Sequence, residues 1–278
     1  MRDRIVEYYQ RKTDFIIEKY GVGNRVHFHM GYFAPPAPAV PVTLSEISLG
    51  MARAQDHLLR VAFGRWSEYS NLNGNILDVG CGLGGTSIWL AEQFGSAVTA
   101  LTNIPTHFPI VAEFAESAGV GGRVRVQFGD AHTFVGGKYD VAVAIESSCY
   151  LDLDRWFGRL CELVRPGGHV LVEDVTFVGS SRRWKNSIDE YWKIDSAPVQ
   201  DLLGAAVGHG FQLVDRVDIT ENVLPFVDWT IAWSRARSQA SNSDARRLGI
   251  SIREHRRFKD ALLGNGVQAQ LLAFQREQ

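Results

Sequence analysis

The sequence contains little cysteine and no long apolar run. Its 278 residues include three cysteines, Cys81, Cys149 and Cys161, an odd number at spacings that do not suit a zinc site. This composition excludes a disulfide framework and predicts no metal centre built on cysteine. No apolar stretch has the length of a membrane-spanning helix, and the first seven residues lack the apolar core of a signal peptide. We therefore expect a cytoplasmic protein that has no membrane partner.

The sequence also lacks an excess of charge of either sign. Lysine and arginine total 29 and aspartate and glutamate total 31, which gives a formal net charge of −2 at pH 7. Such a balance provides no overall attraction to nucleic acid. A hydrophobic content of 45% over this length is enough to build a real core. A small molecule is therefore the expected partner, and nucleic acid is not.

What the sequence does contain is a glycine-dense turn from Asn75 to Gly85, which reads Asn-Ile-Leu-Asp-Val-Gly-Cys-Gly-Leu-Gly-Gly. Residues 76–79 form an apolar run typical of a buried parallel strand, and residues 86–94 show apolar residues at helical spacing. Glycines at this turn remove the Cβ atoms that would keep a ligand away from the backbone, and the start of the helix offers unpaired N–H donors. The stretch therefore predicts a ligand site between a strand and a helix.

The residues around this turn distinguish two classes of ligand. The spacing Gly80-x-Gly82-x-x-Gly85 also fits a dinucleotide fingerprint, which requires an acidic residue about 20 positions later. The second strand, 97–103, ends in Thr-Asn without a carboxylate. Asp78 instead precedes the first glycine, where a negative charge opposes a pyrophosphate and suits a cationic ligand. The sequence therefore favours S-adenosylmethionine over NAD.

The segment from Ile76 to Gly85 resembles the first motif of class I S-adenosylmethionine-dependent methyltransferases. This resemblance implies an α/β fold, a Rossmann-like doubly wound sheet of seven strands in which the last strand is antiparallel. The chain beyond the motif alternates strands and helices, as such a sheet requires. The predicted strands are 76–79, 97–101, 124–129, 141–145, 169–174, 212–220 and 268–274, and the predicted helices between them are 86–94, 108–118 and 154–164.

The predicted organisation is a single globular unit of four parts. Residues 1–66 form an N-terminal helical lid, with helices at 2–20 and 43–65 and a proline-rich linker at 35–41, and residues 67–178 form the cofactor-binding core. Residues 179–210 form an aromatic-rich cap, and residues 211–278 complete the sheet around a helical insertion on the substrate side. The insertion includes an arginine-rich helical stretch, 233–263, which we expect to face solvent or a second copy in a homo-oligomer; an anion site for a diphosphate is the alternative.

Ligands of doubly wound sheets bind at the carboxyl ends of the strands. The resemblance implies that Asp130 and Ala131 bind adenine, and that Thr102 and Asn103 replace the acid that usually binds the ribose. The N-terminal segment around Tyr9 and Gly31 resembles the entry segment of tocopherol, sterol and macrolide-sugar methylating enzymes. The predicted cofactor contacts are Tyr9, Gly31, Asp78, Gly80, Gly82, Leu83, Thr102, Asn103, His107, Asp130, Ala131 and Glu146.

Glu146 and Tyr150 are the predicted catalytic residues. The stretch from Glu146 to Tyr150 resembles the Glu-Ser-x-x-Tyr segment of bacterial isoprenyl diphosphate C-methyltransferases, in which the matching glutamate accepts a proton. Aromatic faces would stabilise the carbocation of such a reaction. We therefore expect C-methylation of a bulky apolar isoprenoid in natural-product biosynthesis, with Mg²⁺ required only if the substrate is a diphosphate. The predicted substrate contacts are Tyr8, Cys149, Tyr191, Trp192, Phe226 and Trp229.

Other functions are also compatible with the sequence. Sugar and macrolide O-methyltransferases also carry a Glu-Ser pair here, so O- or N-methylation of a polyketide, glycoside or alkaloid is the main alternative, with His29, His132 or His209 as the base. His27 and His29 could also be metal ligands, although we expect them to be ordinary polar residues. A NAD-dependent oxidoreductase and a nucleoside sensor belong to other classes; Asp78 counts against the first and the aromatic cap against the second.

Overall fold

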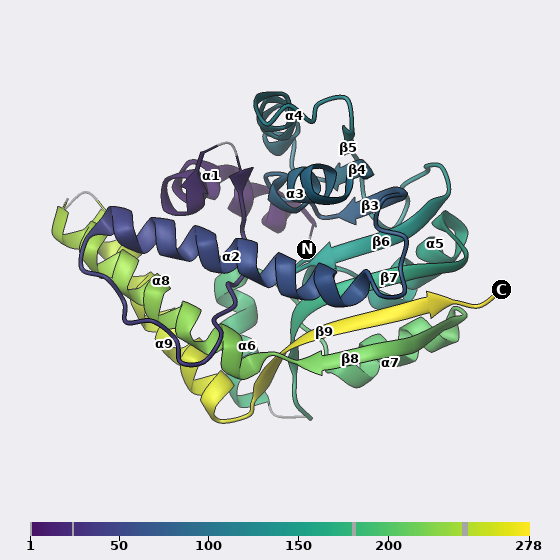
Figure 1. Cartoon of the computed structure of the whole chain (residues 1–278). Helices are drawn as coiled ribbons and strands as arrows, with labels where there is room; N and C mark the ends of the chain where they lie inside the picture. Colours follow the sequence, from purple (N-terminus) through teal and green to yellow (C-terminus); the bar gives the residue numbers. More distant parts are fainter. Residues whose placement is uncertain (1, 24, 180–181, 241–243) are drawn as a thin grey trace.

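A seven-stranded sheet in the order β5-β4-β3-β6-β7-β9-β8 organises the computed structural model, which describes residues 2–23, 25–179, 182–240 and 244–278 (Figure 1). Strand β9 runs antiparallel to both of its neighbours, whereas the pairs from β5 to β7 are parallel. The predicted fold class is confirmed. The strands are β3 (Asn75–Val79), β4 (Ala97–Thr102), β5 (Val124–Phe128), β6 (Tyr139–Ile145), β7 (Val164–Phe177), β8 (Phe211–Asp218) and β9 (Val267–Arg276).

Helices cover both faces of this sheet. Alternate strand residues point to opposite faces, so that Val143 and Leu171 enter one core while Ala142 and Val172 enter the other. Both faces are therefore apolar, as expected for parallel strands that helices bury on both sides. The first core includes residues of α2 (Leu44–Trp66), α3 (Gly85–Phe94) and α4 (His107–Ser117), and the second includes residues of α5 (Leu153–Leu163) and α7 (Val199–Gly208).

The N-terminal part packs across the sheet and against the C-terminal helices. It comprises α1 (Arg2–Tyr20), the short strands β1 (Gly21–Val22) and β2 (Arg25–Val26), and α2, which crosses in front of the strands in Figure 1. Thr43 and Glu46 begin α2 with a capping box. Helix α2 then contacts α8 through Gly50, where a Cβ would lie 2.0 Å from a ring carbon of Trp229. The missing side chain at Gly50 therefore allows the two helices to approach closely.

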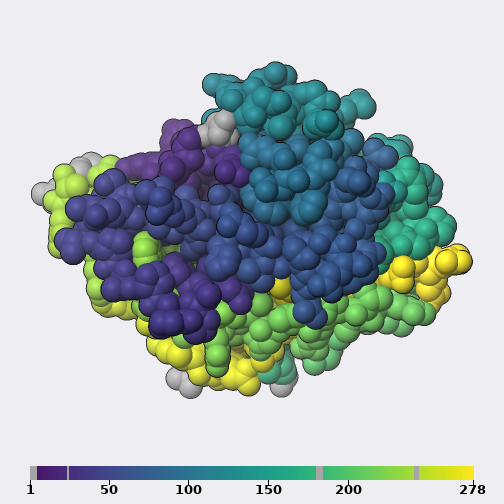
Figure 2. All heavy atoms as spheres, in the orientation of Figure 1, coloured from purple at the N-terminus to yellow at the C-terminus, as the bar shows by residue number. Residues whose placement is uncertain are grey.

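The C-terminal helices lie beyond the carboxyl ends of the parallel strands. These helices are α6 (Arg182–Trp192), α8 (Thr220–Ala240) and α9 (Ala245–Leu263), and the arrowheads of β3 and β6 point toward the space between them and α1 in Figure 1. In the space-filling view, the N-terminal residues form a continuous surface between the green C-terminal helices and the teal helices of the core (Figure 2). On this face of the molecule, the N-terminal residues therefore connect the C-terminal helices with the core.

Two predicted boundaries differ from the structure. The stretch 233–263, expected as one helix or two, is covered by two helices, but the first begins earlier than expected, at Thr220, so that the aromatic segment 223–233 is helical despite Pro225. Buried residues at helical spacing, Val223, Phe226, Val227 and Thr230, explain why packing overrides the proline. The strand expected at 169–174 is longer, since β7 spans Val164–Phe177. Residues 180–181 of the predicted cap and residues 241–243 of the predicted helical stretch lie outside the described residues.

No helix in the described part of the chain is both long enough and apolar enough to span a membrane.

Candidate functional site

A cavity of about 420 Å³ lies at the carboxyl ends of β3 to β6, beneath α1 and the segment that follows β2. Two smaller cavities, of about 110 and 340 Å³, are lined by residues of the C-terminal helices. All but one of the predicted cofactor contacts line the large cavity, from five separate stretches of the chain. These residues are Tyr9, Asp78, Gly80, Gly82, Leu83, Thr102, Asn103, His107, Asp130, Ala131 and Glu146. We call this space the cofactor cavity.

Three of the four glycines of the turn, Gly80, Gly82 and Gly85, are required for different reasons. Gly80 and Gly82 both have positive φ angles, 74° and 54°, which glycine adopts without steric strain. A Cβ at Gly80 would lie 2.7 Å from the Cβ of Ser147, whereas no atom lies within 4 Å of the corresponding position at Gly82. A Cβ at Gly85 would lie 2.6 Å from a ring nitrogen of His27. The positive φ angle therefore explains Gly82, protein packing explains Gly85, and both apply to Gly80.

Asp78 is bound to the first turn of α3. Its Oδ2 accepts a hydrogen bond of 2.5 Å from Ser87 Oγ, and the side chain is buried. Burial raises the pKa of Asp78 to about 6, although the hydrogen bonds from Ser87 oppose this shift. The partial positive charge at the start of a helix also stabilises a carboxylate in this position. Asp78 is therefore a negative group whose charge is partly balanced within the protein.

The opposite end of the cofactor cavity is built around Asp130. Its Oδ1 accepts a hydrogen bond from the backbone N–H of His132 and lies 2.7 Å from His132 Nδ1. His132 Nε2 accepts a hydrogen bond of 3.0 Å from the backbone N–H of Asp152. This network connects the loop after β5 with the start of α5. Asp130 is thus fixed beneath the end of β5, two strands away from Asp78.

His107 and Thr102 lie between these two ends. His107 Nε2 lies 3.2 Å from Thr13 Oγ1 of α1, and burial lowers the pKa of His107 to about 4. Its imidazole is therefore neutral near pH 7, so any contact with a cofactor carboxylate is a hydrogen bond and not an ion pair. Thr102 Oγ1 accepts a hydrogen bond from the backbone N–H of Ile104.

Glu146 occupies the end of β6 in an unusual backbone conformation. Its φ angle is 44°, in the left-handed region that residues other than glycine rarely adopt. Its Oε1 accepts a hydrogen bond of 2.5 Å from the backbone N–H of Met30. Burial raises the pKa of Glu146 to about 8, and Asp174 adds to this shift while the Met30 hydrogen bond opposes it. A strained, buried carboxyl group of this kind is typical of a functional site.

A second cavity of about 110 Å³ continues beyond Glu146 toward the C-terminal helices. Three of the predicted substrate contacts, Cys149, Trp192 and Phe226, line it, and so does Tyr150. Its lining is mainly apolar and aromatic, with Tyr20, Phe28, Phe177 and Phe258 among the further residues. We call this space the acceptor cavity. Glu146, His29, Phe28, Tyr9 and Tyr150 line both cavities, so that these five side chains form the boundary between the two.

Four predicted contacts lie outside both cavities. Gly31 packs between α2 and α8, since a Cβ there would lie 2.6 Å from both Ala54 Cβ and Phe226 Cδ2. Trp229 packs against Gly50, and Tyr8 lines neither cavity but accepts a hydrogen bond of 2.5 Å from Lys12 Nζ. Tyr191 lines a third cavity instead. Gly31, Trp229 and Tyr8 therefore shape the packing around the two cavities, whereas Tyr191 lines a separate space.

Several residues that line the acceptor cavity were not predicted. Asp174, at the carboxyl end of the parallel region of β7, accepts hydrogen bonds from Ser148 Oγ (2.5 Å) and Cys149 N (3.0 Å). His255 of α9 and Tyr20 of α1 also line this cavity. Asp174 is the last residue of the strand expected at 169–174, and this position could have indicated it. No local signal marks His255 or Tyr20, because only the packing of distant helices brings them to the cavity.

Comparison with known proteins supports the same class of function. Residues 76–168 match the family model described as a methyltransferase domain. The chain is 26% identical over 242 residues to tocopherol O-methyltransferase of Arabidopsis thaliana, covering 81% of this chain and 68% of that protein. It is 31% identical over 186 residues to the polyketide synthase ThaQ of Burkholderia thailandensis, covering 66% of this chain but spanning only 9% of ThaQ.

A solved structure shows that the whole fold is shared. Geranyl diphosphate C-methyltransferase from Streptomyces coelicolor A3(2), in complex with Mg²⁺, geranyl diphosphate and S-adenosyl-L-homocysteine, superimposes with a TM-score of 0.81. The match covers 99% of this chain and 97% of that one, at 18% sequence identity. The fold, the glycine turn and the cavity at the strand ends together define an S-adenosylmethionine-dependent methyltransferase of class I. The chain belongs to this family, through the methyltransferase domain at residues 76–168.

Proposed function

We propose that the chain transfers a methyl group from S-adenosylmethionine to a carbon atom of an isoprenoid, with Glu146 as the proton acceptor. The observation that supports this most directly is the position of Glu146, which lines both the cofactor cavity and the acceptor cavity. A carboxylate at that boundary can reach an acceptor held next to the transferred methyl group. The hydrogen bond from Met30 N fixes one of its oxygens and leaves the other available.

S-adenosylmethionine supplies an electrophilic methyl group. An alkene carbon of the acceptor would bond to this methyl carbon as the C–S bond breaks. The products of this step would be S-adenosylhomocysteine and a carbocation on the acceptor. Glu146 then accepts a proton from a carbon next to the cation, and the C–H electron pair forms the new double bond. The protein holds the reacting atoms in line and excludes water. Aromatic rings of Phe28, Trp192 and Phe226 surround the acceptor cavity and can stabilise the cation, by about 0.5 to 2 kcal/mol per well-placed ring.

The polar end of the acceptor would reach a third, basic cavity of about 340 Å³. Its lining includes Lys12, Arg246 and Arg247, with Asp244 only 3.1 Å from Arg247. Burial, together with the nearby charges of Arg247 and Lys193, lowers the pKa of Lys12 to about 8. An anion would relieve this repulsion. Tyr191 lines the basic cavity and its ring lies 4.4 Å from that of Trp192, which lines the acceptor cavity, so the two spaces are neighbours.

A diphosphate substrate in the related structure is accompanied by Mg²⁺. In the described part of this chain, no three or more His, Cys, Asp and Glu side chains are grouped so that they could hold a metal ion. Three of the six described residues that line the basic cavity are cations and one is a carboxylate, Asp244, so the lining does not fit a metal ion. In our proposal the basic side chains themselves balance the charge of an anionic group, and no step uses a metal.

The test is to incubate the purified protein with isotope-labelled S-adenosylmethionine and a series of prenyl diphosphates and the matching alcohols. We expect a methyl group bound to carbon in the product, identified by NMR, and a loss of product with Glu146→Gln. Lys12→Met should raise the KM for a prenyl diphosphate and leave that for the alcohol unchanged, with the exposed residue change Lys138→Met as control. A methyl group bound only to oxygen or nitrogen would refute the proposal.

O- or N-methylation of a polyketide, glycoside or alkaloid is the second candidate, and one observation favours it. His29 lines both cavities, its Nδ1 donates to the carbonyl of Met30 (2.7 Å), and its buried Nε2 has no hydrogen-bond partner among the described residues. Burial lowers the pKa of His29 to about 3, so this nitrogen would be a weak base toward a hydroxyl group. The other predicted bases do not line the acceptor cavity: His132 lies at the Asp130 end, and His209 contacts Asp154. His29→Gln should then abolish activity and Glu146→Gln should not.

A further inference from the structure

Asp174 is a buried carboxylate of the acceptor cavity to which the proposed reaction gives no role. Its Oδ2 accepts hydrogen bonds from Ser148 Oγ (2.5 Å) and from the backbone N–H of Cys149 (3.0 Å), and its Oδ1 accepts one of 2.8 Å from the backbone N–H of Val175. Both oxygens are therefore engaged within the protein. A carboxylate bound in this way is suited to hold other groups in place, whereas Glu146 keeps one oxygen for the acceptor.

The groups that Asp174 binds belong to η1 (Ser148–Tyr150), a short 3₁₀ turn that begins two residues after Glu146. The φ angle of 44° is unfavourable for a glutamate, and such a conformation persists only where the surrounding structure imposes it. Ser147 Oγ donates a hydrogen bond of 2.5 Å to the carbonyl of Val79, which ties the chain after Glu146 to β3. Asp174 ties the next two residues to β7. Two strands thus fix the backbone that follows Glu146.

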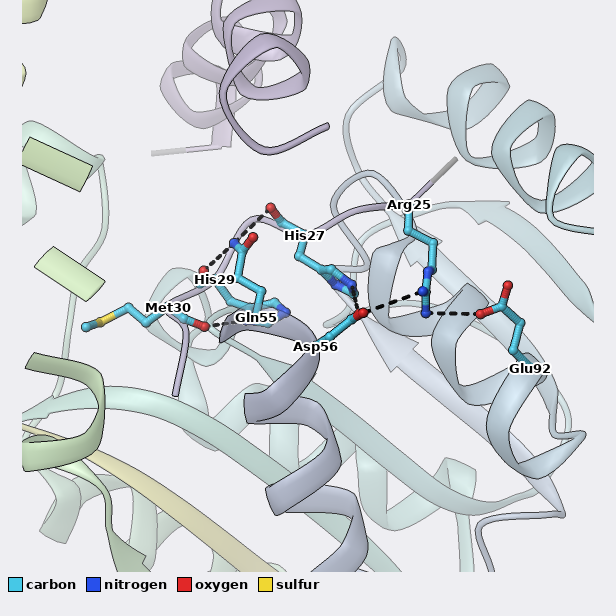
Figure 3. A network of polar contacts seen from close by, with 7 residues as sticks. All are labelled: Arg25, His27, His29, Met30, Gln55, Asp56 and Glu92. Carbon is cyan, nitrogen blue, oxygen red and sulfur yellow. Dashed lines mark hydrogen bonds and ion pairs between the residues drawn. The ribbon is translucent and has the colours of Figure 1, made fainter. Parts of the chain in front are cut away.

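The side chain of Glu146 is fixed separately, by the segment that follows β2. Its Oε1 accepts a hydrogen bond from Met30 N. That segment is tied to α2, because Gln55 Nε2 donates to the backbone carbonyls of His27 (3.1 Å) and His29 (2.6 Å) (Figure 3). The Met30 amide is therefore held in place independently of η1. Its hydrogen bond requires that the backbone of Glu146 keeps its conformation, so this amide reports where the carboxylate lies.

We propose that Asp174 is a positioning residue, which holds η1 so that the Glu146 carboxylate and the Tyr150 hydroxyl both lie at the boundary between the two cavities. Tyr150 is the last residue of η1, and it lines both cavities, as Glu146 does. One carboxylate therefore determines the positions of two side chains between which methyl donor and acceptor would meet. That Glu146 accepts the proton rests on the proposed function, whereas its position can be measured without any acceptor.

The first test measures amide hydrogen exchange by NMR in the full chain and in Asp174→Ala, which removes both acceptor oxygens. The Cys149 amide loses its partner and should exchange about tenfold to hundredfold faster, as expected when a hydrogen bond to a charged group is removed. The Met30 amide should also exchange faster, although it is bound to Glu146 and not to Asp174, because the Glu146 carboxylate moves away from it. A role limited to η1 itself would affect Cys149 and leave Met30 unchanged.

Two further variants and a matched control keep the test decisive. Asp174→Asn retains an oxygen that can accept from Ser148 Oγ and Cys149 N, and should preserve most of the protection of both amides. Ser148→Ala removes one of the two hydrogen bonds to η1 and should have an intermediate effect. Asp140→Ala is the control, because Asp140 also accepts a hydrogen bond from a backbone amide, Asn75 N (2.8 Å), but lines none of the three cavities. Thermal unfolding would establish that each variant is folded.

The second test measures turnover with the prenyl acceptors. Asp174→Ala should lower kcat about tenfold to hundredfold, because a displaced base is out of line with the acceptor. The Kd for S-adenosylhomocysteine should change by less than about threefold, since Asp174 does not line the cofactor cavity.

Two results would overturn the proposal. Unchanged exchange of the Met30 amide in both Asp174→Ala and Ser148→Ala would mean that Asp174 does not position Glu146. A loss of affinity for S-adenosylhomocysteine as large as the loss of kcat would mean that Asp174 supports the fold of the whole site. If the unaltered protein methylates no isoprenoid, the proposed function fails, while the exchange measurements still decide the role of Asp174.

Discussion

The hydroxyl oxygens of Tyr9 and Tyr150 lie 2.5 Å apart, although 141 positions separate the two residues in the sequence. Tyr9 belongs to α1, and Tyr150 follows Glu146 in a short 3₁₀ turn, η1 (Ser148–Tyr150). The Tyr9 ring also packs edge-on against Phe28 and His107, at 5.9 Å in each case. This contact therefore joins the N-terminal helix to the boundary between the cofactor and acceptor cavities.

Tyr9→Phe should weaken this closure without disturbing the packing of the ring. Removal of one hydrogen bond of ordinary strength corresponds to ~0.5–1.5 kcal/mol, so we expect kcat/KM to fall by about twofold to tenfold. Tyr150→Phe should have a similar effect, and the double variant should lose little more than either single variant, because both remove the same bond. Tyr69→Phe is the matched control, since the Tyr69 hydroxyl donates to Asp215 Oδ2 and neither residue lines one of the three cavities. Additive losses would show that the two hydroxyls act separately.

Glu146→Gln should reduce turnover far more than it reduces cofactor binding. The amide keeps an oxygen that can accept the hydrogen bond from Met30 N, but it cannot accept a proton from the acceptor. General base catalysis typically contributes about a hundredfold to ten-thousandfold, and we expect a loss of kcat in that range. The Kd for S-adenosylhomocysteine, measured by calorimetry, should change by less than about threefold. Unchanged turnover would restrict Glu146 to a structural role.

The sequence was sufficient to predict the sheet and most of the cofactor cavity. Apolar strands that alternate with helices determine a doubly wound sheet, and the carboxyl ends of its parallel strands meet along one edge. Residues that directly follow strands or end them, such as Asp78, Thr102 and Glu146, must therefore lie close together whatever the details of packing. The structure places all three in the same cavity.

The acceptor cavity could not be predicted in the same way. Neighbouring residues of a helix point about 100° apart, so only one of two adjacent side chains faces a given cavity. Tyr9 lines a cavity beside Glu146, whereas Tyr8 does not. Trp192 lines the acceptor cavity, whereas Tyr191 does not. Which member of each pair faces inward depends on how α1 and α6 pack, and that depends on contacts between distant segments. Gly31 shows a related difficulty, since its small size serves packing between helices and not access by a ligand.

Three acids near the site should each contribute a loss of stability as pH rises. Burial raises the pKa of Glu146 to about 8, and it raises the pKa values of Glu173 and Asp174 as well. A group whose pKa is higher in the folded state keeps its proton there while the unfolded chain loses it, which favours unfolding by ~1.4 kcal/mol per pH unit for each such proton. The loss should begin near pH 4.5, the ordinary pKa of glutamate, and for Glu146 continue to about pH 8.

Denaturant unfolding between about pH 5 and pH 8 would measure this slope. Glu173 has both carboxyl oxygens buried without a hydrogen-bond partner in the described part of the chain, so its proton is strongly retained. Glu173→Gln removes that titration and should make the slope shallower. Glu162→Gln, an exposed residue on α5, is the control and should leave the slope unchanged. An identical slope in Glu173→Gln would show that this carboxyl group is not protonated in the folded protein.

Binding of S-adenosylmethionine should release a proton, whereas binding of S-adenosylhomocysteine should not. With a pKa of about 8, the Glu146 carboxyl is mostly protonated at pH 7 in the free protein. The sulfonium charge of S-adenosylmethionine, bound beside Glu146, favours the carboxylate and lowers this pKa, while the neutral sulfur of S-adenosylhomocysteine has no such effect. The protein would thus generate its base only when the methyl donor is bound. Calorimetric titrations at pH 7 in buffers with different heats of ionisation would give the number of protons released. In Glu146→Gln, we expect S-adenosylmethionine to release no more protons than S-adenosylhomocysteine does. Equal proton release for both ligands would mean that another group titrates.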